Sequence, residues 1–131
     1  MAIVDYAGLT AGQTDSDIGK MICKFVILEK SGSLSLVMGP VTRFRYHAGL
    51  LDHYCRDHGI PASWAKKPDL VEIHDSSVVL HGGGWMEVDM DSSKARLYGT
   101  STAYGPYRSD LARRIIADHP HFARFRVTYS R

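Results

Sequence analysis

Hydrophobic and polar residues alternate along several short segments of the chain, and this alternation predicts β-strands. Residues 21–29, with the sequence MICKFVILE, are apolar on both faces, which is typical of a strand in the centre of a sheet. A tight turn at residues 30–33 and a second alternating run at 34–38 predict that this strand continues into a β-hairpin. The same pattern predicts further strands at residues 70–73, 77–81, 85–90, 94–98 and 122–130.

Two other segments repeat their apolar residues at helical spacing. In residues 46–56 the apolar stripe consists of Leu50, Leu51, Tyr54 and Cys55. The second helix is expected to begin at Ser109 or Asp110, either of which can cap it, and to end before Pro120. Its apolar stripe consists of Leu111, Ala112, Ile115 and Ile116.

The remaining segments lack such periodicity. Residues 1–19 are rich in Gly, Thr and Asp and predict a loosely ordered N-terminal arm, followed by one domain at residues 20–131. Residues 59–68 contain two prolines and predict an irregular connection. The glycines at 82–84 are expected to separate the strands on either side of them.

Composition narrows the class of protein. A chain of 131 residues with 44% hydrophobic and 23% charged residues is typical of one soluble globular domain. The net charge of +2 gives no general affinity for nucleic acid, so any anion must be bound by a local cluster. No signal peptide and no membrane span is recognisable, and Cys23 and Cys55 are expected as buried free thiols. We therefore expect a cytoplasmic protein with neither membrane nor nucleic acid as a partner.

The loop at residues 98–106 (YGTSTAYGP) is the strongest candidate for an anion site. It joins a predicted strand to a predicted helix, and most of its residues are small, hydroxylic or glycine. Backbone N–H groups and a hydroxyl can converge on a small anion there, because no bulky side chain blocks the approach. The same composition is also typical of an ordinary turn, so composition alone leaves both interpretations open.

Two side chains could act together with this loop. Lys24 lies on the same face of its predicted strand as Val26 and Leu28, so its ammonium either reaches water at the rim of the sheet or is held there for an anion. His47 falls in the first turn of a predicted helix, where unpaired N–H groups favour a phosphate and a neutral imidazole. A neutral histidine suits a general base, although a surface histidine would give the same pattern.

Several catalytic templates do not fit. A cysteine-dependent phosphatase needs an arginine at a fixed spacing after the cysteine, but the corresponding positions after Cys23 and Cys55 hold Glu29 and Pro61. The histidines lack the partners and spacing of a zinc site. The glycines at 82–84 belong to neither a P-loop nor a dinucleotide fingerprint. The remaining candidate chemistry uses a histidine, a lysine and a Gly/Ser loop, without a metal or cofactor.

These elements, in this order, resemble the Janus/Ocnus family. The matching segments are KFVI at residues 24–27, YHA at 46–48, GGG at 82–84 and YGTSTAYGP at 98–106. The spacing of the triple glycine before YG and S-x-AYGP is the most specific part of the match. The resemblance extends over about residues 20–129, and the region at 59–77 is longer here than in animal members of the family.

The resemblance implies an α+β fold: a single domain with a mixed β-sheet of about five to six strands and two main helices. It also implies that residues 20–131 form a phosphohistidine phosphatase domain. Such a domain removes phosphate from phosphohistidine in a protein substrate and releases inorganic phosphate, with no cofactor.

The resemblance also assigns roles by position. His47 is expected to be the general base that activates water, and Lys24 a cationic contact to the phosphoryl group. Backbone amides of His47, Ala48 and Ala103, with Ser101, are expected to form a phosphate cradle. The expected phosphate-binding residues are Lys24, Tyr46, Ala48, Ser101, Thr102 and Ala103.

One position departs from the family. Its members carry an arginine between the second strand and the first helix, where this chain has Met38 or Gly39. Arg43 and Arg45 are the candidates to replace it from a shifted position. Two alternative functions follow: a non-catalytic module that binds phosphate or a phosphopeptide, and a hydrolase of phospholysine or small phosphoramidates.

Overall fold

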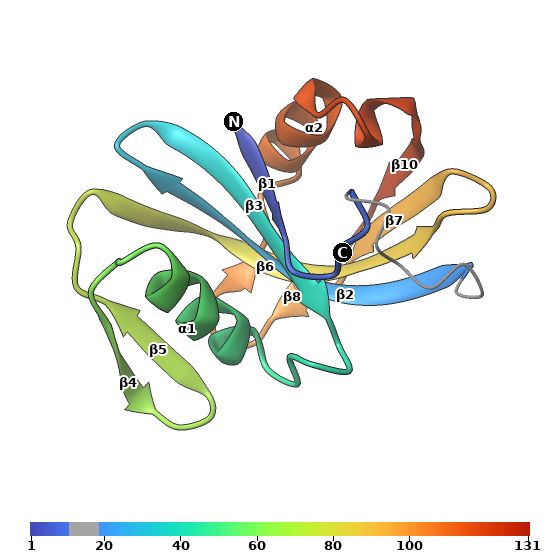
Figure 1. The fold of residues 1–131 in the computed structure, drawn as a ribbon. Helices are drawn as coiled ribbons and strands as arrows, with labels where there is room; N and C mark the ends of the chain where they lie inside the picture. The colour runs from blue at the N-terminus through green and yellow to red at the C-terminus, as the bar shows by residue number, and fades with distance from the viewer. Residues whose placement is uncertain (11–18) are drawn as a thin grey trace.

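The computed structural model describes residues 1–10 and 19–131, and within them it has an α+β fold (Figure 1). An eight-stranded mixed sheet contains the path β1-β3-β2-β6-β7-β10, with β9 paired to β6 and β8 paired to β9, and β4 and β5 form a separate pair. The strands are β1 (Ala2–Asp5), β2 (Lys20–Lys30), β3 (Ser33–Pro40), β4 (Ala62–Lys66), β5 (Leu70–Ile73), β6 (Val78–Asp89), β7 (Lys94–Tyr98), β8 (Thr100–Ser101), β9 (Gly105–Pro106) and β10 (Arg126–Tyr129). The helices are α1 (His47–Asp57), α2 (Ser109–Asp118) and a 3₁₀ turn at Phe122–Arg124.

The strand directions confirm a mixed sheet. β2 pairs in antiparallel fashion with β3 on one side and with β6 on the other, and β6 pairs in the same way with β7. The outer strands β1 and β10 instead run parallel to β3 and β7. This pairing confirms the predicted hairpin of β2 and β3 and the central place of β2. The two predicted main helices are also confirmed.

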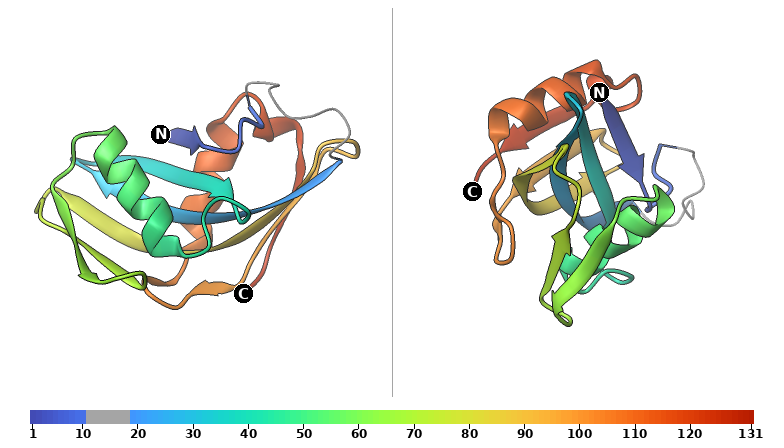
Figure 2. Two further views of the ribbon diagram at one scale, coloured as in Figure 1. Left: turned by 60° about the horizontal axis from the view of Figure 1, so that its bottom comes forward. Right: turned by 90° about the vertical axis from the view of Figure 1, so that its left-hand side faces the viewer.

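The two helices pack on opposite faces of the main sheet, as the right-hand view of Figure 2 shows. Cys23, Phe25 and Ile27 of β2 belong to the core cluster under α2, whereas Val26 and Leu28 belong to the cluster under α1. Successive residues of a strand point to opposite faces, so a strand covered on both faces is apolar throughout. Both cysteines are buried free thiols, as predicted.

The sheet also corrects the interpretation of the triple glycine. β6 continues through residues 82–84 without a break, and its register against β2 shifts between Val26 and Leu28. Gly82 has a φ of +82° at this irregularity, which only glycine adopts at low cost. A Cβ on Gly83 would lie 2.5 Å from the Phe25 carbonyl oxygen, and one on Gly84 would lie 2.6 Å from that of Tyr98. The glycines thus permit close approach of neighbouring strands.

Four further expectations were wrong in part. Residues 62–66 form β4 instead of an irregular connection, and the final strand covers only residues 126–129. Residues 2–5 pair with β3 and Leu9 is buried, so this part of the N-terminal arm is not loosely ordered. The rest of the expected arm, residues 11–18, lies outside the described residues. Helix α2 has Arg108 as its N-cap residue, with no side-chain cap from Ser109 or Asp110.

No helix within residues 1–10 and 19–131 combines the length and the hydrophobicity that a membrane-crossing helix requires.

Candidate active site

His47 is the first residue of α1 and its ring is buried, with 6% of the residue exposed. Its Nε2 lies 2.8 Å from the carbonyl oxygen of Gly84, and its ring meets the Trp85 ring edge-on with 5.1 Å between centroids. Because a carbonyl oxygen only accepts hydrogen bonds, Nε2 must carry the proton and donate it. The lone pair of the neutral ring is therefore on Nδ1, which makes no hydrogen bond within the part of the chain that the structure describes.

The environment favours the neutral form of this ring. Burial lowers the pKa of His47 below its ordinary value of 6.5, and the nearby Lys24 charge lowers it further. The hydrogen bond with the Gly84 carbonyl acts in the opposite direction but does not outweigh the burial. A histidine with a lowered pKa has its Nδ1 lone pair available near neutral pH, as a general base requires.

Lys24 lies across from Trp85 on the neighbouring strand β6. Its Nζ donates a hydrogen bond to the backbone carbonyl of Arg45 and lies 5.6 Å from the ring centroid of Trp85 and 5.9 Å from that of Tyr46. Only 9% of the residue is exposed, and burial followed by the Arg45 charge lowers the pKa of Lys24. An ammonium has three donors, so this group retains donors for a ligand beside His47.

The N-terminus of α1 lies at the same place: Tyr46 and His47 line the pocket beside Lys24, whereas Ala48, also predicted to bind phosphate, is fully buried and is not among the lining residues. The N–H groups of Gly49 and Leu50 bond to the Tyr46 carbonyl, so those of His47 and Ala48 precede the first hydrogen-bonded turn. The first turn contains no acidic residue and Tyr46 provides no side-chain cap. Unpaired N–H groups and the partial positive charge of a helix N-terminus both favour an anion.

The loop at residues 98–106 contributes only some of its expected residues. Thr102 and Ala103 line the pocket beside His47. Ser101 is 1% exposed and does not line the pocket; its Oγ accepts the N–H of Tyr104 at 3.1 Å. The Ser101 hydroxyl therefore holds the shape of the turn, and the expectation that it contacts phosphate directly is not supported by its position.

Together these elements form a pocket of about 750 Å³. It is lined by Lys24, Arg45, Tyr46, His47, Lys66, Asp69, Leu70, Trp85, Thr102 and Ala103. Sequence reasoning missed Trp85 and the three residues contributed by the β4–β5 hairpin. Trp85 follows the triple glycine directly. Had β6 been recognised as one continuous strand, this position would have indicated that Trp85 lies beside the glycines in the site. The hairpin was hidden because its prolines indicated an irregular connection.

The hairpin forms one wall of the pocket and is attached to the loop at 98–106. Lys66 and Asp69 form an ion pair at 3.8 Å across its turn. The Tyr104 hydroxyl accepts the N–H of Val71 at 3.0 Å and donates to the Val71 carbonyl at 3.1 Å. Figure 1 shows the hairpin beside α1, and both the hairpin and the loop contribute residues to the pocket that contains His47.

The two candidate arginines lie in different places. Arg45 lines the pocket, but Arg43 does not: its Nη2 is 3.3 Å from His53 Nε2 and its guanidinium lies over the Phe44 ring. Arg43 is therefore excluded as a direct replacement for the family arginine. The two positions where the family carries its arginine hold uncharged residues. Met38 is fully buried, and a Cβ on Gly39 would overlap the Phe44 ring, so neither position presents a cation to the pocket.

No group of three or more His, Cys, Asp or Glu side chains is arranged as a metal site within residues 1–10 and 19–131. The donors in the pocket are the ammonium groups of Lys24 and Lys66, the Arg45 guanidinium and backbone N–H groups, which suit an anion, whereas Nδ1 of His47 and the Asp69 carboxylate are acceptors.

Comparison with protein-family models gives a match to the Janus/Ocnus family (Ocnus) over residues 15–126. No curated protein matches the chain. The matched range contains the first and last pocket residues, Lys24 and Ala103, and both helices. The match confirms the resemblance carried by the triple glycine and the loop at 98–106. The chain therefore belongs to the Janus/Ocnus family.

Proposed function

We propose that this protein hydrolyses the P–N bond of phosphohistidine in proteins and releases inorganic phosphate. One observation carries the proposal: a neutral histidine with a free Nδ1 lies in the same pocket as a buried ammonium and a helix N-terminus. The first group can activate water, and the other two can bind a phosphoryl group. The activity that the family resemblance implies supports the same reaction.

The proposed step needs few groups because a phosphoramidate bond is labile. Nδ1 of His47 takes a proton from water, and the water oxygen attacks phosphorus in line with the P–N bond. The P–N electron pair stays on the leaving nitrogen of the substrate, which takes up a proton from solvent, and His47 releases its proton to solvent to restore the neutral ring. Lys24 and the N–H groups of His47, Ala48 and Ala103 neutralise charge on the phosphoryl oxygens. Positioning and charge stabilisation supply most of the catalysis in such transfers.

Replacing Lys24 with alanine is expected to raise the KM for a phosphohistidine peptide by about tenfold or more, since a hydrogen bond to a charged group contributes about 1.5–3 kcal/mol. Steady-state kinetics measure this effect, and Lys30→Ala, an exposed lysine at the far end of β2, is the matched control. An unchanged KM together with a much lower melting temperature would instead assign Lys24 a packing role.

The pH dependence of kcat/KM is expected to be bell-shaped, with both limbs displaced to low pH. The pKa of His47 is lowered from 6.5, so the base becomes active as pH rises through a value below 6.5. The pKa of Lys24 is lowered from 10.5, so its charge is lost as pH rises through a value below 10.5. In Lys24→Arg the cation stays protonated, and the alkaline limb should disappear while the acidic limb stays in place. An acidic limb above pH 6.5 would contradict the assignment of the base.

A binding module without turnover is the second candidate, and the absent arginine favours it. Neither Met38 nor Gly39 presents a charge to the pocket, and Arg45 is the arginine among its lining residues. Phosphate release from a phosphohistidine peptide, measured beside a binding titration with the same peptide, separates the two functions. Binding without release would establish the module. A parallel assay with phospholysine and phosphoramidate identifies a hydrolase with a different leaving group.

A further inference from the structure

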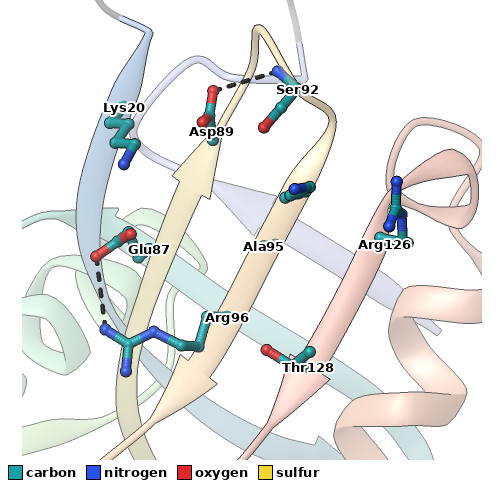
Figure 3. Close-up of a pocket in the computed structure, with 9 residues that line it drawn as sticks. Lys20, Glu87, Asp89, Ser92, Ala95, Arg96, Arg126 and Thr128 are labelled. Atoms are coloured by element: carbon teal, nitrogen blue, oxygen red, sulfur yellow. Dashed lines mark hydrogen bonds and ion pairs between the residues drawn. The ribbon is translucent and has the colours of Figure 1, made fainter.

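A second hollow of about 550 Å³ lies on the main sheet next to the candidate active site. Its lining residues come from β2, β6, β7, β10 and the β6–β7 turn, and most of them are charged (Figure 3). They are Lys20, Glu87, Asp89, Ser92, Lys94, Ala95, Arg96, Arg126 and Thr128. We refer to this set of residues as the charged face.

The charged face is the part of the sheet that α1 leaves uncovered. The cluster under α1 includes Val26 and Leu28 from the second half of β2, but not Lys20 or Ile22 from its first half. Ile22 points to the same side of the strand and is 41% exposed. Among the described residues, both helices therefore leave this face open.

Cations outnumber carboxylates on the charged face and are largely unpaired. Glu87 forms an ion pair with Arg96, with 3.5 Å between Oε2 and Nη2. Asp89 accepts the N–H groups of Asp91 at 3.1 Å and of Ser92 at 3.3 Å. Within residues 1–10 and 19–131, Lys20, Lys94 and Arg126 take part in no ion pair. These three cations are therefore available to an outside anion.

A row of stacked side chains connects this face to His47. The Trp85 ring meets His47 edge-on and stacks on Tyr98, with 6.5 Å between the ring centroids. The Arg96 guanidinium lies 4.0 Å from the centroid of the Tyr98 ring and reaches Glu87 on the charged face. This row of side chains thus runs from Trp85 in the wall of the active-site pocket to Arg96 and Glu87 on the charged face.

We propose that the charged face binds an acidic, extended segment of the substrate protein next to its phosphohistidine, an inference that rests on the proposed function. Trp85, Glu87 and Asp89 follow one another on the same side of β6. Successive residues on one side of a strand are about 7 Å apart. For an extended peptide whose phosphohistidine lies in the pocket, the charged face therefore begins about two residues away from the phosphohistidine and ends about four residues away. The strand register places Lys20, Lys94 and Arg126 level with Asp89, so a carboxylate about four residues from the phosphohistidine would meet these cations.

The arrangement of charges favours a peptide over a nucleic acid. Glu87 and Asp89 lie between the cations of β2 and those of β7 and β10, as Figure 3 shows. The phosphates of a nucleic acid are evenly spaced and would meet these carboxylates, whereas a peptide can place its own carboxylates opposite the cations alone. Complementary charge of this kind mainly affects specificity and association.

Two histidine peptides test the proposal, one with glutamates and one with glutamines at two and four residues to either side of the histidine. Each is measured as the phosphohistidine form in the turnover assay and as the unphosphorylated form in a binding titration. The Lys94→Gln/Arg126→Gln variant removes two cations of the face, and Lys30→Gln/Arg114→Gln removes two exposed cations elsewhere. Poly(U) RNA serves as the nucleic-acid competitor.

The glutamate peptide is expected to bind about fivefold more tightly than the glutamine peptide and to have a correspondingly lower KM, because each exposed charge pair contributes a fraction of a kcal/mol to about 1 kcal/mol. High salt and the Lys94/Arg126 variant should abolish this difference, whereas the control variant should retain it. Selective glutamate binding without turnover would support the docking face and refute the proposed reaction. Equal binding of both peptides, an unchanged preference in the Lys94/Arg126 variant, or tighter binding of RNA would overturn the docking proposal, whatever the turnover.

Discussion

His47→Ala is expected to lower kcat/KM for phosphohistidine hydrolysis by about 10²–10⁴-fold, the usual contribution of a general base. The variant removes the Nδ1 lone pair from a pocket that otherwise retains Lys24 and the N–H groups of α1. It also leaves the Gly84 carbonyl without its partner, which costs about 1–3 kcal/mol of folding stability. We therefore expect a folded protein with a lower melting temperature and with phosphate binding largely intact.

The measurement combines phosphate release, circular dichroism and a phosphate titration. His74→Ala is the matched control, because His74 is exposed and bonds to Ser63 outside the pocket. It should keep its turnover. Turnover near the wild-type rate in a folded His47→Ala protein would remove this residue from the mechanism, and phosphate binding would then have to be explained by Lys24 and the backbone alone.

Gly82→Ala is expected to lower the free energy of unfolding by about 3 kcal/mol or more, the sum of backbone strain and overpacking. Gly82 has a φ of +82°, and a Cβ there would overlap the backbone carbonyl of Pro106. Backbone atoms of a paired strand cannot move aside as the end of a flexible side chain can, so both costs should appear in full. Urea denaturation measures the loss.

Gly32→Ala separates the two costs. Gly32 has nearly the same backbone angle, with a φ of +84°, but a Cβ there would meet nothing within 4 Å. The control should lose only about 1 kcal/mol, the cost of strain alone. Equal losses in the two variants would show that close packing against β9 does not constrain β6.

The predictions from sequence succeeded where a short local pattern decides the structure. The two-faced apolar run of residues 21–29 identified the central strand, because a strand covered on both faces has no polar side. Helical spacing of apolar residues identified α1 and α2. His47 and Lys24 were identified through the order of motifs along the chain, and the structure places both in one pocket.

The errors arose where a residue type has two common uses. Glycine favours turns but also permits close strand contacts, so the triple glycine was interpreted as a break in β6. Prolines at the ends of the 59–68 segment hid β4, and the hydroxyl of Ser101 bonds to its own turn instead of facing the pocket. In each case the structure depends on a contact with a residue that is distant in sequence, or on a turn geometry that the residue type alone does not reveal.

The sequence by itself determined the family, the α+β class, the central strand and the identity of the candidate base and cation, because periodicity and the order of motifs along the chain do not depend on which residues meet in space. Only the tertiary structure decided which nitrogen of His47 is free, since that depends on a carbonyl oxygen 37 residues away in the chain. It likewise decided that Trp85 and the β4–β5 hairpin line the pocket and that Arg43 lies outside it. Contacts between strands and loops that are distant in sequence fix these positions, and no local pattern encodes them.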